Sequence, residues 1–213
     1  MYIVERSRRF MEGLLKSYGP TNIKRLIWNK EFSHGKWDFI DNTAGDCVYA
    51  PLEKYARNGS ILDLGCGPGN TANELKADAY GTYLGVDISE ACLAKAARRT
   101  EETGRTAKNR FEQADFITYV PTRKFDVILF RESMYHVPLG KVKATLDRYS
   151  KYLNDGGVFV VRIDTSTGDS GKTKYRPKAM VDVMASEFDV VENLQLVGKA
   201  KTTVIIFRPK PVS

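Results

Sequence analysis

Residues 61–70 read ILDLGCGPGN: an apolar run typical of a buried strand, then three glycines at alternate positions, then residues suited to begin a helix. Glycine leaves no Cβ between the main chain and a bound molecule, and the free N–H groups of a first helical turn can donate to it. The stretch therefore predicts a backbone that wraps a ligand. A tight turn without a ligand would also tolerate glycine.

The detail of this loop narrows the class of ligand. Asn70 stands where the third glycine of a G-x-G-x-x-G dinucleotide loop would be, which disfavours a pyrophosphate. Asp63 precedes the first glycine by two residues, and a carboxylate there repels a diphosphate but attracts a cationic amine or sulfonium. The loop thus favours a zwitterionic ligand over a nicotinamide dinucleotide.

Strand-like and helix-like stretches alternate from residue 60 onward. The strand-like runs cover residues 61–64, 83–86, 110–113, 125–130 and 158–163, and the helix-like stretches cover 71–77, 90–103 and 141–153. Such alternation predicts an α/β fold with a doubly wound, Rossmann-like parallel sheet and a ligand crevice beyond the carboxyl ends of its strands.

The two ends of the chain depart from this alternation. Residues 188–197 and 202–207 read as strands joined by a short connection, which predicts an antiparallel hairpin and hence a mixed sheet. Residues 1–58 show helical spacing, a Gly19-Pro20 break and an aromatic segment, and we expect them to form a lid over a ligand-binding domain of residues 59–213. An N-terminal helix packed outside the sheet is the alternative.

Acidic residues recur at the predicted strand ends. Asp87 lies 22 residues after Gly65, the position of a carboxylate that accepts from a ribose diol. Asp115 and Phe116 end the third strand, where an acid can accept from an exocyclic amine and a ring can cover a purine face. Each acid alone could be explained as a cap of the following helix, but their recurrence favours an adenosyl ligand.

Composition sets broader limits. The 213 residues are 42% hydrophobic and 28% charged and contain no apolar run long enough to span a bilayer, so we expect a soluble protein with no membrane role. Three cysteines without metal or disulfide spacing, and an N-terminus without a secretory core, favour the cytoplasm and indicate no metal site. The net charge of +7 comes from residues 1–40 and 170–213, each with eight basic and four acidic side chains.

Taken together, these motifs resemble the class I S-adenosylmethionine-dependent methyltransferases. The resemblance implies a seven-stranded sheet of order 3-2-1-4-5-7-6 with an antiparallel last strand, S-adenosyl-L-methionine as cofactor and S-adenosyl-L-homocysteine as product. The cofactor-binding residues that it implies are Asp63, Gly65, Cys66, Gly67, Asn70, Asp87, Ile88, Asp115, Phe116 and Arg131.

The segment after the fourth strand, FRESMYHVP at 130–138, supplies the candidates for catalysis. We expect His136 to act as a base and Tyr135 to orient the acceptor, with structural hydrogen bonding and packing as the alternatives. Glu132 is expected to accept from the ammonium group of the cofactor or from an amine of the substrate, with helix capping as the alternative.

Three further residues are expected to bind the substrate. They are His34 and Trp37 of the lid and Asp164 after the fifth strand, with aromatic packing and turn formation as the alternatives for the last two. The rings of Trp28 and Trp37 could also close over the sulfonium, where a cation–π contact would help.

We therefore expect methyl transfer to an oxygen or nitrogen of a small molecule, by a monomer or homodimer. Neither the Asn-Pro-Pro-Tyr-like segment nor the Pro-Cys pair of nucleobase enzymes follows the fourth strand. The basic ends motivate an alternative, a methyltransferase of RNA or protein, although nucleic acid is not the favoured partner. A non-catalytic S-adenosylmethionine-binding module is a third hypothesis.

Overall fold

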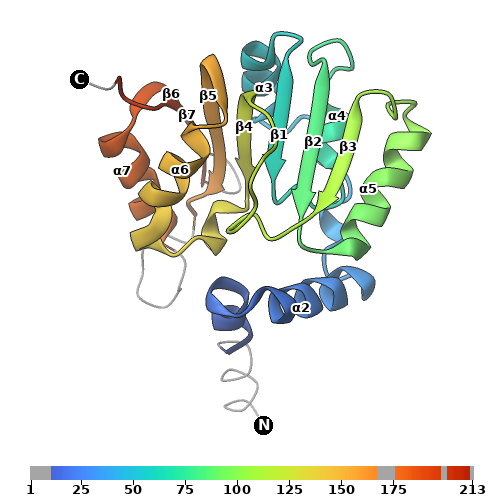
Figure 1. Ribbon diagram of the computed structural model, residues 1–213. Helices are drawn as coiled ribbons and strands as arrows, with labels where there is room; N and C mark the ends of the chain where they lie inside the picture. The colour runs from blue at the N-terminus through green and yellow to red at the C-terminus, as the bar shows by residue number, and fades with distance from the viewer. Residues whose placement is uncertain (1–10, 167–175, 198–200, 212–213) are drawn as a thin grey trace.

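The computed structural model describes residues 11–166, 176–197 and 201–211. Its centre is a seven-stranded sheet of order β3-β2-β1-β4-β5-β7-β6 (Figure 1). The strands are β1 (Ser60–Leu64), β2 (Thr82–Asp87), β3 (Asn109–Gln113), β4 (Phe125–Arg131), β5 (Leu153–Asp164), β6 (Asp189–Val197) and β7 (Lys201–Arg208). The predicted fold class and strand order are confirmed.

The pairing explains why the sheet is mixed. β1 runs parallel to β2 and β4, with Ile61 opposite Tyr83 and Val127, and the β2–β3 and β4–β5 pairs are also parallel. β7 lies antiparallel between β5 and β6, as the predicted hairpin requires. Because the parallel strands share one direction, β1, β2 and β4 all end at one edge of the sheet.

Helices cover both faces of the sheet. They are α3 (Tyr49–Ala56), α4 (Asn70–Glu74), α5 (Glu90–Glu102), α6 (Val142–Ser150) and α7 (Pro177–Glu187). Alternate strand residues form two cores: Leu62 and Ile128 pack with α6 and α7, and Ile61 and Val127 pack with α3 and α4. Side chains of successive strand residues point to opposite faces, so a strand covered on both faces reads as a continuous apolar run.

Some predicted helices differ from the observed ones. The helix expected over 141–153 ends at Ser150, because the chain turns and Leu153 already belongs to β5. The helix expected over 71–77 ends at Glu74. Helix α7 was not predicted, although Pro177 at its first turn and the buried Met180 and Met184 are typical of one.

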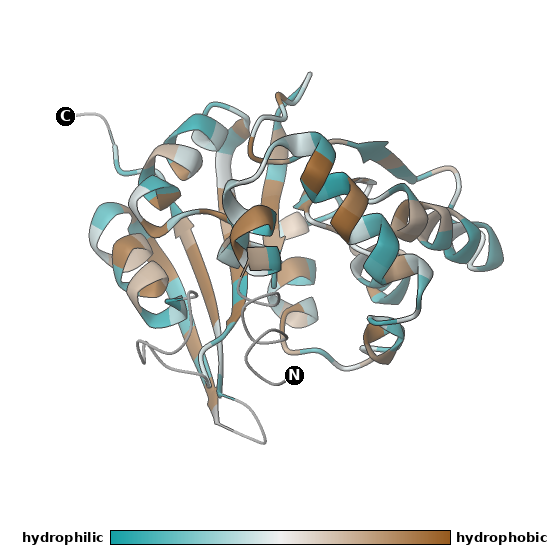
Figure 2. Cartoon of the chain, turned by 90° about the horizontal axis from the view of Figure 1, so that it is seen from below, coloured by the Kyte–Doolittle hydropathy of each residue, from teal (hydrophilic) through white to brown (hydrophobic). Residues whose placement is uncertain are grey.

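The N-terminal segment forms a separate layer. Residues 11–18 are helical, and α2 (Thr21–Ser33) and the short helix η1 (Asp38–Ile40) follow. Figure 1 shows α2 beneath the carboxyl ends of β1 to β3, beside α5. Figure 2 views this side and shows hydrophobic and hydrophilic stretches mixed on the helices that face the viewer.

The helix α3 lies elsewhere, although the prediction grouped it with the lid. It packs against β4 and β5, and its buried Leu52 and Ala56 belong to the core of the sheet. No helix among the described residues is long and apolar enough to cross a membrane.

Candidate active site

A cavity of about 640 Å³ lies between the N-terminal layer and the carboxyl ends of the strands. This volume is within the range of small-molecule sites. Every predicted site residue except His34 lines it, from Asp63 and the glycine loop to Tyr135, His136 and Asp164. The chain therefore brings the predicted cofactor and acceptor residues into one space.

The glycine loop presents bare main chain to this cavity. Gly67 has φ +55°, and a Cβ added there would have nothing within 4 Å, so its open side faces the cavity that it lines. Gly65 has φ +84°, and an added Cβ would lie 2.5 Å from Cβ of Ser133. The left-handed conformation favours glycine at both positions, and at Gly65 close packing requires it as well.

Asp63 is buried at the base of the loop. Its Oδ2 accepts a hydrogen bond from the hydroxyl of Tyr83 at 2.6 Å, but its Oδ1 has no hydrogen-bond partner among the described residues. Burial raises the pKa of Asp63 to about 6. An unpartnered buried carboxylate oxygen on a cavity wall is suited to receive a cationic donor.

The acids after β2 and β3 are already partly engaged. Asp87 accepts from the main-chain N–H groups of Gly67 at 3.0 Å and Ser89 at 2.9 Å, and burial raises its pKa. Asp115 accepts from Ile117 N at 3.0 Å. Both side chains thus make the local bonds of the capping alternative while also lining the cavity.

Helix α2 is attached to these same strand ends by polar contacts. Lys24 donates to Oδ2 of Asp115 at 2.9 Å, and both side chains are buried. Asn29 accepts from the hydroxyl of Ser89 at 2.8 Å. The lid is therefore held against the loops that follow β2 and β3.

Two arginines and two acids form a network where β4 and β5 end. Arg131 contacts Asp46 at 2.7 Å, and Arg162 contacts Asp46 at 3.4 Å and pairs with Glu132. Burial favours the neutral form of Asp46. The positive charge of Arg131 and a hydrogen bond from the main-chain N–H of Val48 nevertheless hold the pKa of Asp46 below its ordinary value. Burial raises the pKa of Glu132.

Glu132 has an unusual backbone. Its φ of +54° lies in the left-handed region, which costs a residue with a Cβ about 1 kcal/mol or more and is found at functional sites. Its half-buried side chain lines the cavity at the end of β4 and pairs with Arg162. This geometry marks Glu132 among the predicted catalytic residues.

The other two predicted catalytic residues are held by neighbours. The Tyr135 hydroxyl donates to the carbonyl of Asp164 at 2.9 Å and accepts from its N–H at 2.6 Å, and burial raises its pKa. The His136 ring meets Trp28 edge-on at 5.0 Å between centroids. Tyr135 thus positions the end of β5, and His136 joins the lid to the β4 end of the cavity.

A cluster of aromatic residues from the N-terminal layer lines the cavity beside His136. Trp28 packs against Trp37 at 5.7 Å between centroids. Nζ of Lys16 lies 4.1 Å from the centre of the Trp28 ring and 2.5 Å from Glu31, which also accepts from the Trp37 indole at 2.9 Å. Lys16 therefore already occupies the cation–π position on Trp28 that the sequence suggested for a bound sulfonium.

His34 does not reach the cavity. It follows the last residue of α2, its Nδ1 lies 2.7 Å from the carbonyl of Lys30, and its side chain is exposed. The prediction placed it in an irregular aromatic segment, whereas the continuous helix turns it outward.

Sequence reasoning also missed several cavity residues, which are Lys16, Lys24, Asp46 and Arg162. A signal for Arg162 was present, because it lies two residues before Asp164 on the same strand and alternate strand residues share a face. The other three lie in the N-terminal segment, where no spacing rule relates a residue to the sheet edge.

The chain matches a known family of protein domains. A family model described as a methyltransferase domain matches residues 38–187. The chain belongs to this methyltransferase domain family. The match includes the glycine loop, the acids after β2 and β3, and the β4 end, so it confirms the resemblance to class I S-adenosylmethionine-dependent methyltransferases.

This chain is similar to curated proteins over part of their length. It is 36% identical over 115 residues to trans-aconitate 2-methyltransferase of Agrobacterium fabrum, which is 53% of this chain and 40% of that protein. The matched part of the chain thus spans about two fifths of that relative.

Solved structures agree in fold. The N-methyltransferase NodS of Bradyrhizobium japonicum, in complex with S-adenosyl-L-homocysteine, has a TM-score of 0.68 at 16% identity and covers 86% of this chain and 98% of its own. Magnesium protoporphyrin IX methyltransferase of Synechocystis has a TM-score of 0.69 at 15% identity, and the match covers 88% of this chain and 99% of that one.

Proposed function

We propose that this methyltransferase transfers a methyl group from S-adenosyl-L-methionine to an oxygen or nitrogen atom of a small-molecule acceptor. The observation that carries the proposal is the single cavity that joins the glycine loop and the acids of β1 to β3 with the β4 end, beneath the N-terminal lid. A donor and an acceptor bound there would share one space, in which the reacting atoms can be aligned as methyl transfer requires.

The residues present fit the cofactor. The unpartnered Oδ1 of Asp63 suits an ammonium group, the bare main chain of Gly67 suits close approach, and Asp87 retains lone pairs for a ribose diol. Phe116 and Ile88 supply apolar cavity wall for an adenine ring. When bound, S-adenosylmethionine supplies a methyl group already activated by its sulfonium.

Glu132 is the group that accepts a proton from the acceptor. Its carboxylate faces the cavity, and burial raises its pKa toward the range where a carboxylate is an effective base. Arg162 fixes its orientation by an ion pair. Tyr135 holds the neighbouring end of β5, and His136 shapes the acceptor space through its contact with Trp28.

The lid favours a small acceptor over a polymer. Trp28, Phe32 and Trp37 line the roof of the cavity, and the tether from Lys24 to Asp115 holds this roof against the sheet edge. The related trans-aconitate 2-methyltransferase is named for a small acceptor, which agrees with this interpretation.

Two measurements test the proposal. Calorimetry should detect binding of S-adenosylhomocysteine and none of nicotinamide dinucleotide. Incubation with S-adenosylmethionine and a panel of small phenols, acids and amines should release S-adenosylhomocysteine, and Glu132→Gln should lower kcat about a hundredfold without weakening cofactor binding. Cofactor binding without turnover across a broad panel would favour the non-catalytic module, and binding of the dinucleotide alone would refute the proposal.

A further inference from the structure

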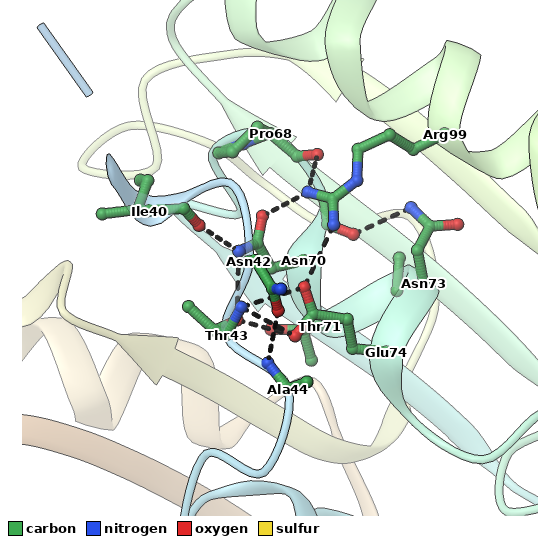
Figure 3. Close-up of polar contacts among 12 residues, drawn as sticks. Ile40, Asn42, Thr43, Ala44, Pro68, Asn70, Thr71, Asn73, Glu74 and Arg99 are labelled. Carbon is green, nitrogen blue, oxygen red and sulfur yellow. Dashed lines mark hydrogen bonds and ion pairs between the residues drawn. The ribbon is translucent and has the colours of Figure 1, made fainter. Parts of the chain in front are cut away.

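The nitrogen and the oxygen of the Asn70 side-chain amide both make hydrogen bonds to neighbouring protein groups. Asn70 is the first residue of α4, follows Gly69 directly and is buried. Its Nδ2 donates to the carbonyl of Ile40 and, at 3.0 Å, to the hydroxyl of Thr43, while its Oδ1 accepts from Arg99 at 2.5 Å (Figure 3). An amide has two donor hydrogens, and both point to the segment that connects the lid to the sheet domain.

That segment, residues 38–46, is called the strap below. Phe39, Ile40, Thr43 and Asp46 of the strap line the cavity together with the glycine loop. Its far end is held by the ion pair between Asp46 and Arg131. The strap thus forms a cavity wall that runs from the glycine loop to the end of β4.

A second side chain, one helical turn later, also binds the strap. Glu74 accepts from the main-chain N–H of Thr43 at 3.2 Å and from its hydroxyl at 2.8 Å, and Arg99 donates to Glu74 at 3.0 Å. Figure 3 shows Asn70 and Glu74 bonded to Thr43, and Arg99 bonded to Asn70 and Glu74. Asn70 and Glu74 therefore both link the sheet domain to the strap, and Arg99 holds the two side chains in place.

We propose that Asn70 is a positioning residue that pins the strap over the glycine loop, so that the bound cofactor is enclosed between the two. The proposal rests on the cofactor binding proposed above and revises the expectation that Asn70 itself contacts the cofactor. A glycine at this position, as in a G-x-G-x-x-G loop, offers no side chain to hold the strap.

The substitution Asn70→Asp separates this role from folding. Aspartate keeps the size of the side chain and an oxygen for Arg99, and a carboxylate at the first turn of a helix is favourable. It lacks both hydrogens that reach the strap and sets a negative oxygen against the carbonyl of Ile40. Since two hydrogen bonds are lost, we expect S-adenosylhomocysteine to bind about tenfold more weakly, with faster amide hydrogen exchange in residues 38–46.

Asn73 provides a matched control. It lies one turn later on the same helix and is also buried. Its amide donates to the carbonyl of Gly69 at 2.8 Å and accepts from Thr100 at 3.1 Å, both within the sheet domain. Asn73→Asp therefore makes the same chemical change without touching the strap, and we expect unchanged exchange there and S-adenosylhomocysteine affinity within about twofold of wild type.

A variant in the strap itself completes the test. Thr43→Val removes the hydroxyl that Asn70 reaches, so it should weaken S-adenosylhomocysteine binding, and combining it with Asn70→Asp should add less than the two single effects. The proposal would be overturned if Asn70→Asp kept the wild-type hydrogen exchange in residues 38–46 and the wild-type affinity for S-adenosylhomocysteine. It would also be overturned if Asn73→Asp weakened binding and sped up that exchange as much as Asn70→Asp does. Wild-type protein that does not bind S-adenosylhomocysteine would instead refute the proposed function, which distinguishes the two failures.

Discussion

At the scale of single residues, Asp63 couples the cofactor site to pH. Burial raises the pKa of its carboxyl from 3.8 to about 6, so over this range the folded chain binds a proton that the unfolded chain has released. The free energy of unfolding then falls as pH rises through the window, by on the order of 3 kcal/mol. Below this pH range Asp63 is protonated in both the folded and the unfolded chain, and the destabilisation disappears.

Asp63→Asn should remove this contribution. Urea unfolding at about pH 4 and about pH 7 measures it as the difference between wild type and variant. S-adenosylhomocysteine should bind the wild type more tightly as pH rises through about 6, where the carboxylate forms, and the variant should lose this rise. An identical pH profile for the two proteins would contradict the assignment.

A methyl group at Gly67 should act on the ligand more than on the fold. Its added Cβ meets no atom within 4 Å in the cavity-facing loop, so Gly67→Ala should cost about 1 kcal/mol of backbone strain but weaken S-adenosylhomocysteine binding by more than about tenfold. Calorimetry and urea unfolding measure the two effects.

Gly104 is the matched control for that strain. Its φ is +66°, it is exposed, and an added Cβ there also meets nothing within 4 Å. Gly104→Ala should show a similar loss of stability and wild-type cofactor affinity. Equal weakening of binding in both variants would mean that strain, and not blocked approach, is responsible.

At the scale of elements, α2 depends on a buried ion pair. Lys24 and Asp115 are 9% and 5% exposed, and removing one partner of such a pair leaves the other uncompensated. Lys24→Met should therefore lower the free energy of unfolding by about 3 kcal/mol, and adding Asp115→Asn should recover part of the loss. Urea unfolding of the single and double variants measures the coupling.

The pair between Lys95 and Asp38 serves as a control for this prediction. Like the pair of Lys24 and Asp115, it holds the N-terminal layer to the sheet domain, in this case to α5. Its side chains, however, are 28% and 57% exposed. Lys95→Met should cost no more than about 1 kcal/mol. Equal costs for Lys24→Met and Lys95→Met would show that burial of the pair is not decisive.

The same elements show what the sequence could and could not predict. The strands were predictable because their apolar runs and turn residues act locally, and Gly65, Asp87 and Asp115 were placed at the correct sheet edge by strand direction alone. The partner of Asp115 was not predictable, since Lys24 is 91 residues away and no spacing rule links a lid helix to the sheet. The exposed position of His34 outside the cavity was not predictable either, because α2, which ends just before it, was not recognised as a continuous helix.

At the scale of the whole molecule, the roofed cavity argues against a polymer acceptor. The net charge of +7 should attract RNA weakly at low salt, and that attraction should fall steeply as salt displaces it. Fluorescence anisotropy of a labelled single-stranded RNA should therefore show no binding at about 0.15 M salt. Binding that persists there and is reduced by S-adenosylhomocysteine would instead support the RNA methyltransferase.

The contacts between α2 and the sheet domain have a consequence for how such enzymes diversify. The bed that we propose for the methyl donor is built from residues at the ends of β1, β2 and β3. The roof over the proposed acceptor space comes from a continuous N-terminal stretch that meets this bed through a few polar contacts. A chimera that grafts another enzyme's roof onto this bed, with those anchors retained, would exchange substrate preference while inheriting the methyl donor.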